Sequence, residues 1–262
     1  LINQFASTKR MCMALGVESL DELTANLESL LEMDPPASWW ERLKALPEFA
    51  RLARIFPSLV EEAPAQEIAK TGNDASIAGI PAIKAWPGDA GAFVSLGCVF
   101  TKDPATGKRN CGMYRLQVFD DRTLGFHSHL HHAGAAHARE TPEGERLPVA
   151  VAIGTDPAVT FAAVAPLPPG MDEMLLAGYL RGSGVAMAKC RTVPLEVPAS
   201  SEIVLEGWVD PREKRIEGPY GDHTGFYSLP DEYPVLHLTA VTHRRDPIYA
   251  TTIVGPPPME DC

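Results

Sequence analysis

The run from Glu217 to Ser228 constrains the fold and chemistry of this chain more than any other segment. It reads Glu-Gly-Pro-Tyr-Gly-Asp-His-Thr-Gly-Phe-Tyr-Ser, so acids and a histidine stand among glycines and a proline. Glycine and proline interrupt both helices and β-ladders, and the sequence therefore predicts a shaped loop here. Loops of this kind that carry acids often serve chemistry. The alternative is a plain surface turn, and the motifs of the second half of the sequence argue against it.

Charge and cysteine usage narrow the class of protein. The formal net charge of -11 argues against nucleic-acid binding, because that binding depends on basic contacts to phosphate. The five cysteines, Cys12, Cys98, Cys111, Cys190 and Cys262, form no CxxC pair and no regular spacing. They indicate free thiols in a reducing cytosol, and so a cytoplasmic location. No apolar run is long enough to span a membrane, and no signal peptide is recognisable.

The first part of the chain, from about Ser19 to Leu59, has a helical pattern. Ser19 can cap a helix, and Glu22 stands where a capping box needs its second partner. Apolar side chains then recur at helical spacing, at Leu20, Leu23, Leu27, Leu30 and Leu31. Pro35-Pro36 ends this helix, and a second helix is predicted to begin near Ser38. Its Trp39, Leu43 and Leu46 are expected to be core or interface residues.

From about Gln66 onwards the sequence changes to short β-rich runs separated by glycine and proline. The runs are residues 92–100, 114–119, 149–153, 202–209 and 235–241. Strands at this spacing predict a barrel or a sandwich. Together with the helical first part, they indicate a fold of the α+β class.

Histidines are concentrated in one segment, between His127 and His137. His127, His129 and His131 alternate, so they would lie on one face of a strand. That spacing alone suggests a transition-metal site. The alternative is that several of them are ordinary polar residues near a ligand or the surface.

A series of motifs in consistent order resembles the UbiD-type decarboxylases, which use a prenylated flavin. Besides the run 217–228, the motifs are Asn110–Arg115, Leu180–Gly182, Val197–Gly207, Gly255–Asp261 and the opening Asn3–Gly16. The resemblance spans nearly the whole chain. It implies that residues 66–262 form an FMN-binding split β-barrel and that residues 1–65 are the helical part of an N-terminal α/β domain. It also implies further segments before Leu1 and after Cys262, so we expect a fragment of a longer enzyme.

The resemblance implies a cofactor and a metal site. The family's metal-binding histidine stands in a His-x-x-Gly-Ala stretch, which selects His131, with His132 as the alternative. Asn110 and Glu173 are the other implied ligands, and this oxygen-rich set suits Mn²⁺ or Mg²⁺. The implied contacts to prenylated FMN are Asn110, Met113, Tyr114, Arg115, His131 and Glu173. Backbone carbonyls of residues 162–168 would face a K⁺ ion, and a flavin prenyltransferase would supply the cofactor.

Three residues are expected to carry the chemistry. Arg115 falls in an apparent strand, and a buried arginine needs an anionic partner. Glu217 and Asp222 are available, and the resemblance implies an Arg-acid-acid triad. Some relatives have Glu at the second acidic position, so Asp222 reaches one methylene less far. We expect Glu217 to protonate the product carbon and Arg115 to hold the substrate carboxylate by a bidentate contact.

The expected function is non-oxidative, reversible decarboxylation of an aromatic or α,β-unsaturated carboxylic acid. No side chain can act as the electron sink for the carbanion-like centre, so a cofactor must do so. The resemblance also implies a homo-oligomer, a dimer or a hexamer, in the full-length protein. One alternative is a non-catalytic, flavin-binding fragment that lacks the C-terminal domain. A His-cluster metal hydrolase without flavin is another, whereas Ser228 has no evident His and Asp partners for a serine hydrolase.

Overall fold

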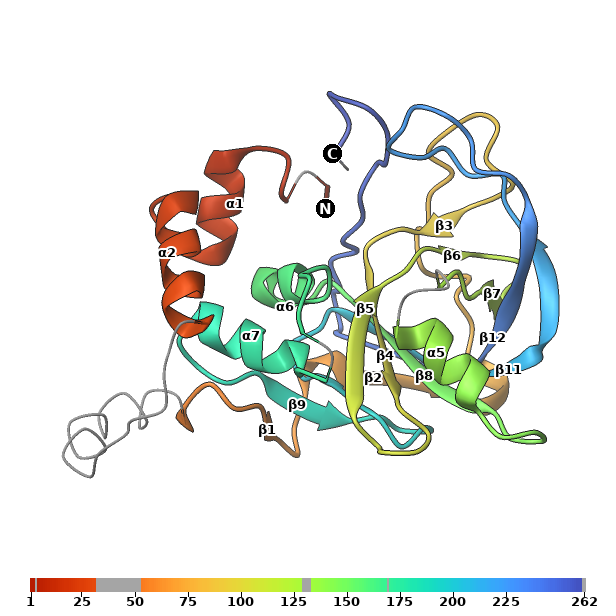
Figure 1. The fold of residues 1–262 in the computed structure, drawn as a ribbon. Coiled ribbons are helices and arrows are strands. Elements are labelled where there is room, and N and C mark those ends of the chain that lie inside the picture. The colour runs from red at the N-terminus through yellow and green to blue at the C-terminus, as the bar shows by residue number, and fades with distance from the viewer. Residues whose placement is uncertain (3, 32–52, 129–132, 169, 261–262) are drawn as a thin grey trace.

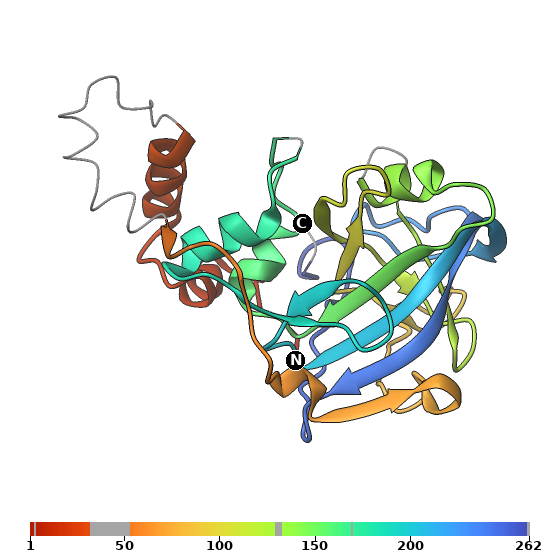
Figure 2. The same cartoon turned by 90° about the horizontal axis from the view of Figure 1, so that it is seen from below.

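The computed structural model describes residues 1–2, 4–31, 53–128, 133–168 and 170–260. It has a mixed α+β architecture with predominantly antiparallel sheets. Two N-terminal helices lie on one side of the molecule, and two long strands lie on the opposite side (Figure 1). The same separation is seen from below in Figure 2.

The described elements follow one another along the chain with a β-rich middle and end. The α-helices are α1 (Thr8–Leu15), α2 (Leu20–Leu31), α5 (Ala133–Glu140), α6 (Pro157–Ala162) and α7 (Glu173–Arg181). The strands are β1 (Ser58–Leu59), β2 (Ile68–Thr71), β3 (Phe93–Val94), β4 (Gly97–Lys102), β5 (Arg109–Met113), β6 (Leu116–Gln117), β7 (Thr123–Gly125), β8 (Leu147–Ile153), β9 (Ala186–Lys189), β10 (Glu196–Pro198), β11 (Ile203–Glu217) and β12 (Asp231–His243). Two 3₁₀ turns are η1 (Pro64–Gln66) and η2 (Gly72–Asp74).

The main sheet is built around the antiparallel pair β11 and β12. Its order is β2-β12-β11-β8-β4-β5, and β7 also pairs with β12. The first half of β11 is buried because β8 and β12 flank it, and Ile203, Val204 and Leu205 are at most 3% exposed. Register shifts interrupt the β11–β12 ladder twice, which bends the pair. The smaller sheets are β1-β9-β10 and β3-β6.

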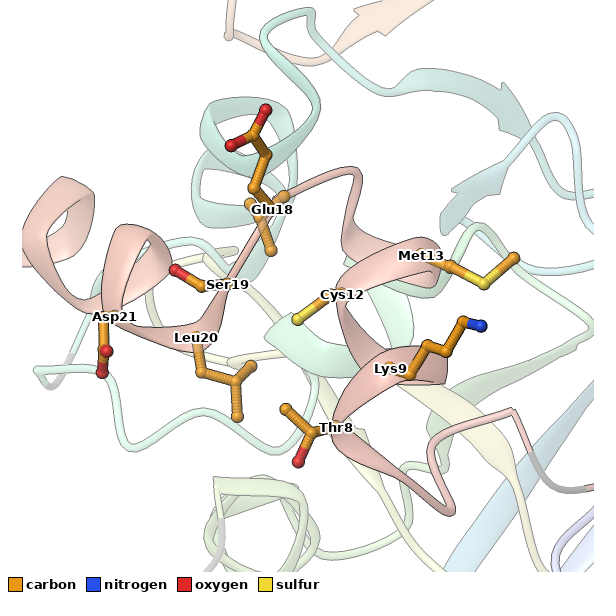
Figure 3. Close-up of a pocket in the computed structure, with 9 residues that line it drawn as sticks. Thr8, Lys9, Cys12, Met13, Glu18, Ser19, Leu20 and Asp21 are labelled. Carbon is orange, nitrogen blue, oxygen red and sulfur yellow. The ribbon is translucent and has the colours of Figure 1, made fainter.

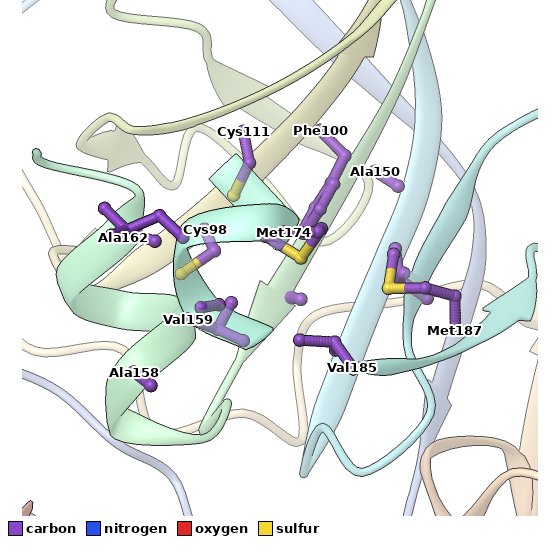
Figure 4. Packing of buried hydrophobic residues seen from close by; sticks show 14 of the residues in the cluster. Cys98, Phe100, Cys111, Ala150, Ala158, Val159, Ala162, Met174, Val185 and Met187 are labelled. Carbon is purple, nitrogen blue, oxygen red and sulfur yellow. The ribbon is translucent and has the colours of Figure 1, made fainter. Parts of the chain in front are cut away.

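Two hydrophobic clusters occupy the two faces of this sheet. One joins α6 and α7 to β4 and β8 through residues such as Phe100, Val159 and Met174 (Figure 4). Leu15 and Leu23 belong to the same cluster, so helices α1 and α2 share a core with the sheet. The other cluster includes Val99, Val151, Leu205 and Leu236 with the rings of Tyr114 and Phe126. Alternating side chains of the central strands therefore pack on opposite faces.

The strand predictions are confirmed where the runs are apolar. Residues 149–153, 202–209 and 235–241 fall almost wholly within β8, β11 and β12, while 92–100 is divided between β3 and β4. The run 114–119 is largely wrong as a strand, because only Leu116–Gln117 form β6. Arg115 lies in the link between β5 and β6 and not in a strand. Glu217 is the last residue of β11, so the predicted loop begins at Gly218.

The helical predictions are confirmed at the start of α2. Ser19 Oγ accepts a hydrogen bond from the Glu22 amide at 3.1 Å. The Glu22 carboxylate turns back to the Glu18 amide at 2.8 Å instead of the Ser19 amide. The sequence also predicts a helical pattern up to Leu59, but Ser58–Leu59 form strand β1, which pairs with β9. The predicted second helix around Ser38 lies outside the described residues.

The thiols, the helices and the histidine segment bear on three further predictions. Cys12, Cys98, Cys111 and Cys190 are free thiols there. None of the helices that the structure describes is long and apolar enough to cross a membrane. His127 lies in a segment without strand assignment, so it does not share a strand face with other histidines, and residues 129–132 are outside the described ranges.

Candidate active site

A buried ion pair joins the β5–β6 link to the end of β11. Arg115 Nε lies 2.9 Å from Oε1 of Glu217, and Arg115 Nη2 lies 3.2 Å from Oε2. The Glu217 side chain has no exposed surface, and that of Arg115 is 13% exposed. The guanidinium also stacks over the ring of Tyr220, with 4.6 Å between its central carbon and the ring centroid. Arg115 thus has the anionic partner that its burial requires.

His127 is a second partner of the same carboxylate. Its Nδ1 lies 2.6 Å from Oε2 of Glu217, and its ring stacks on Tyr233 with 4.0 Å between centroids. Burial raises the pKa of Glu217, but the hydrogen bonds from His127 and Arg115 outweigh it and the pKa is lowered. Glu217 is therefore an ionised carboxylate with both oxygens engaged.

The loop after Glu217 is fixed by side chains from other parts of the chain. Asp89 accepts hydrogen bonds from the amides of Gly221 at 2.7 Å and Trp86 at 2.8 Å. Ser228 Oγ accepts from Arg115 Nη2 at 3.1 Å and from the Tyr220 amide at 3.2 Å. These bonds tie both ends of the loop to the ion pair, so the predicted loop is shaped and anchored.

Glycine is required at position 221 by close packing. A Cβ atom built there would stand 2.2 Å from the Trp86 ring, which no side chain can tolerate. Trp86 in turn donates from Nε1 to the Val254 carbonyl at 2.8 Å and makes an edge contact with Tyr227. The loop is thereby packed against the segment that leads to the C-terminus.

Asp222 is the more accessible of the two predicted acids. Its side chain is 33% exposed, and its Oδ1 lies 2.9 Å from Nδ1 of His223. Burial raises its pKa, but hydrogen bonds from His223 and the charge of Arg115 lower it overall. Among the described ion pairs none joins Asp222 directly to Arg115. Of the predicted triad, Arg115 and Glu217 are paired, and the charge of Arg115 helps to lower the pKa of Asp222.

The geometry bears on the roles expected for Arg115 and Glu217, which stay predictions. The Nε and Nη2 atoms of Arg115 form a bidentate contact with Glu217, which leaves Nη1 for a contact with another anion. Nη1 has no hydrogen bond to any described residue. The Glu217 side chain has no exposed surface, whereas that of Asp222 is 33% exposed, so Asp222 is the more accessible candidate for the proton donor.

The implied metal ligands Asn110 and Glu173 lie on the edge strand β5 and at the start of α7, respectively. Glu173 is the first residue of α7, where Asp172 caps the helix by accepting from the Met174 amide at 2.9 Å. Its Oε2 accepts a hydrogen bond from the Cys111 amide at 3.0 Å, next to Asn110. Burial raises the pKa of Glu173 to about 7. The Glu173 carboxylate thus contacts the backbone of β5 one residue after Asn110.

Asn110 has an unused donor in this arrangement. Its Nδ2 atom is buried and has no hydrogen-bond partner among the described residues. Buried polar atoms are normally paired, so this amide is expected to have a partner beyond the described residues. His131 lies outside the described residues. Among the described residues, no three His, Cys, Asp or Glu side chains form a group that could bind a metal ion. Asn110 and residues 129–132 are not included in that statement.

A cavity of about 310 Å³ adjoins the end of β5. It is lined by residues from the N-terminal segment, β5, α6 and the C-terminal segment, namely Gln4, Phe5, Met11, Ser95, Leu96, Met113, Thr160, Phe161, Val164, Thr252 and Glu260. Met113 was predicted to contact the cofactor. Val164 belongs to the segment 162–168 that was expected to face an ion. The volume is at the lower end of the range for small-molecule sites, roughly 300–1,000 Å³.

Tyr114 does not line this cavity. Its ring is buried in the sheet's second cluster, and its hydroxyl accepts a hydrogen bond from the Gly134 amide at 3.3 Å. Burial raises the pKa of this hydroxyl. Tyr114 therefore connects β5 to α5, immediately after the residues 129–132.

A larger groove of about 770 Å³ lies between α1 and α2 (Figure 3). Its lining includes Thr8, Lys9, Cys12, Leu20 and Asp21. None of the predicted site residues contributes to it. We therefore place the candidate active site at the Arg115–Glu217 pair, the loop 218–228 and the β5 edge.

Sequence reasoning missed three residues that build this site. His127 was noted as part of a histidine cluster but not as the partner of Glu217. Asp89 and Ser228 were not assigned a role in holding the loop. Only tertiary contacts reveal them, because His127 and Glu217 are 90 positions apart and Asp89 and Gly221 are 132 apart.

Comparison with known proteins shows the family of the chain. The family model UbiD, described as the 3-octaprenyl-4-hydroxybenzoate carboxy-lyase Rift-related domain, matches residues 58–257. An uncharacterized protein of Archaeoglobus fulgidus is 46% identical over 262 residues, covering 99% of this chain and 53% of that protein. One of Aquifex aeolicus is 44% identical, covering 100% of this chain and 54% of that protein. The chain spans about half the length of these relatives.

Solved structures are similar in fold over most of this chain. The UbiD-class enzyme HmfF from Pelotomaculum thermopropionicum, in complex with FMN, has a TM-score of 0.80 and 30% identity, with 95% of this chain and 52% of that chain covered. Vanillic acid decarboxylase of Sedimentibacter hydroxybenzoicus, in its closed form, has a TM-score of 0.82 and 29% identity, with 99% and 53% covered.

Proposed function

Because the chain belongs to the UbiD family, we propose that it carries the flavin-dependent active site of a carboxylic acid decarboxylase. The proposed reaction is non-oxidative, reversible decarboxylation of an aromatic or α,β-unsaturated acid. The observation that carries the proposal is the buried Arg115–Glu217 pair beside an anchored acidic loop. A carboxylate substrate needs a fixed cation, and carbon protonation needs an accessible acid close by.

The residues present fit a flavin and a hard divalent cation. The 310 Å³ cavity is lined by Met113 at the end of β5, the amide of Asn110 on β5 has no hydrogen-bond partner among the described residues, and the half-buried Glu173 of α7 bonds the β5 backbone at Cys111. We propose that Asn110, Glu173 and His131 hold Mn²⁺ or Mg²⁺ and that Met113 and Arg115 contact the flavin. A K⁺ ion at carbonyls of 162–168 and a contact from Tyr114 remain part of the proposal. When bound, a prenylated flavin supplies the electron sink for decarboxylation.

The side chains of this chain then divide the remaining tasks. Arg115 offers Nη1 to the substrate carboxylate, while Glu217 holds its other edge in place. We assign the proton donor to Asp222, because its carboxyl group is accessible and that of Glu217 is not. Asp222 can take its proton from solvent and release it to the carbon after carbon dioxide leaves. The charge of Arg115 then favours return of Asp222 to the ionised form.

The experiment is to produce the protein together with a flavin prenyltransferase and to measure its visible absorption and carbon dioxide release. We expect a bound flavin and release of carbon dioxide from at least one phenolic, heteroaromatic or acrylic acid. A flavin-free protein that hydrolyses esters or amides with a bound metal would favour the His-cluster hydrolase instead.

A second candidate is a flavin-binding module that needs further chain for turnover. It is favoured by the coverage, since the relatives are about twice as long as the matched region. If this second candidate is correct, the protein binds flavin but releases no carbon dioxide unless the chain is extended to the length of the relatives. Turnover compared between the two lengths separates the candidates.

The proposed architecture is an FMN-binding split β-barrel preceded by a helical segment. We propose a boundary at residues 65 and 66, with β1 at Ser58–Leu59 pairing across it with β9. Homo-oligomer formation also remains a proposal. A solved relative, HmfF, is known in an evolved dimeric form with prenylated FMN.

A further inference from the structure

His127 is held in place by three neighbouring elements. Its neighbour Phe126 donates from its amide to the Pro234 carbonyl at 2.8 Å, which fixes the backbone after β7 against β12. The imidazole stacks on Tyr233 of β12 at an interplanar angle of 25°. Its Nδ1 then points at Glu217 on β11. The ring is only 5% exposed, so its orientation is set by packing and not by solvent.

The contact between His127 and Glu217 requires a proton on Nδ1. Glu217 is ionised and can only accept, so at 2.6 Å the imidazole must donate. Among the described residues other than His127, Oε2 of Glu217 accepts a hydrogen bond only from Arg115 Nη2, at 3.2 Å. That bond is longer than the 2.9 Å bond from Arg115 Nε to Oε1. Without His127 this buried oxygen would be weakly bonded, and the carboxylate could rotate away from the guanidinium.

We propose that His127 is a positioning residue for decarboxylation, because its Nδ1–H locks Glu217 and, through it, the Arg115 guanidinium. The inference rests on the proposed function and adds a residue to it. His127 does not touch the substrate in this role. It acts by fixing the edge of Arg115 that faces away from the substrate, so that Nη1 stays in one place.

Two substitutions separate the hydrogen bond from packing. His127→Asn keeps an N–H donor near the Nδ1 position but is smaller, whereas His127→Leu keeps an apolar side chain and has no donor. We expect kcat/KM of His127→Leu to fall roughly 10- to 100-fold, as for loss of one hydrogen bond to a charged group. The loss should lie mainly in KM, because Arg115 holds the substrate. His127→Asn should stay within about threefold of the wild type in kcat/KM, since the donor is kept.

A role in packing alone predicts the reverse order, with His127→Leu more active than His127→Asn. That order, or equal activity of His127→Leu and the wild type, would overturn the proposal. Urea unfolding of both variants confirms that each is folded under the assay conditions.

A second measurement needs no substrate. In the wild-type protein, proton NMR should show a strongly downfield Hδ1 signal of His127, and this signal should vanish in Glu217→Gln. A nitrogen spectrum in which Nδ1 carries no proton would refute the proposal even if the enzyme is active. If the spectrum is as expected and no acid is decarboxylated, the proposed function fails while the contact itself stands.

Discussion

The substitution Glu217→Gln tests the buried ion pair most sharply. It preserves the shape of the side chain but removes the negative charge that faces Arg115 and His127. Glutamine has one acceptor oxygen, so its amide N–H₂ must face a donor, either Arg115 at 2.9–3.2 Å or His127 at 2.6 Å. The structure offers no room for these groups to reach water, because the Glu217 side chain is 0% exposed.

The expected loss of stability follows from this burial. Each hydrogen bond to a charged group contributes about 1.5–3 kcal/mol, and removing one partner of a buried pair costs about 3–5 kcal/mol. We expect the free energy of unfolding to fall by about 3–5 kcal/mol in a urea titration. Turnover should fall at least about 100-fold, equivalent to about 2.7 kcal/mol of transition-state stabilisation. Bound flavin should be retained, because Glu217 does not line the 310 Å³ cavity.

Glu213→Gln is the matched control. Glu213 makes the same kind of contact, with His237 Nε2 at 2.8 Å, but its side chain is 39% exposed. An exposed pair contributes about 0–1 kcal/mol, so the control should unfold nearly as the wild type does. If Glu217→Gln unfolds within about 1 kcal/mol of wild type, or turns over at near-wild-type rate, the assignment of Glu217 is refuted.

Three further predictions concern Glu217, the proposed metal site and the buried Glu206. The pKa of Glu217 is lowered in the folded state, so the stability that the ionised carboxylate contributes is complete above the ordinary pKa of glutamate and is lost as pH falls through the lower folded-state pKa. The difference in unfolding free energy between wild type and Glu217→Gln should therefore shrink below about pH 4. A difference that does not change with pH would contradict this. His131→Ala should lower bound metal and bound flavin together, measured by metal analysis and absorption, and such a loss in His132→Ala instead would show that the other histidine is the ligand. Glu206→Gln should lower the free energy of unfolding by about 2–4 kcal/mol in urea, because the buried Glu206 carboxylate accepts three hydrogen bonds from Arg191 and Thr192, and a change below about 0.5 kcal/mol would rule this out.

The sequence predicts the buried parts of the fold better than the exposed parts. Apolar runs such as 149–153 and 235–241 are strands because hydrophobic burial drives them into the sheet. The second half of β11, from Asp210 to Glu217, is polar and was not predicted, since its pairing with β12 is stabilised by backbone hydrogen bonds that leave little sequence pattern. Ser58–Leu59 is a strand for the same reason, through pairing with β9.

The pairing of Arg115 with an acid was predictable from the sequence, but its atomic geometry was not. Arg115 and Glu217 were identified from the motifs, and their burial explains why they meet. The bidentate contact between them could not be foreseen, because a sequence does not show which atoms of a guanidinium are already bonded. His127 was not assigned to Glu217, since nothing local distinguishes it from the other histidines of its segment. Its role depends on the packing of β7, β11 and β12.

The most direct test of the central claim is carbon dioxide release by the protein produced with a flavin prenyltransferase, measured for a panel of aromatic and α,β-unsaturated acids in parallel with Asp222→Asn. The account predicts release from at least one acid by the wild type, with loss of at least about 100-fold in the variant, in the range expected for a general acid. Release at equal rates by wild type and Asp222→Asn would contradict the proposed proton donor. A flavin-loaded protein of the relatives' full length that releases no carbon dioxide from any of these acids would contradict the proposed decarboxylase function.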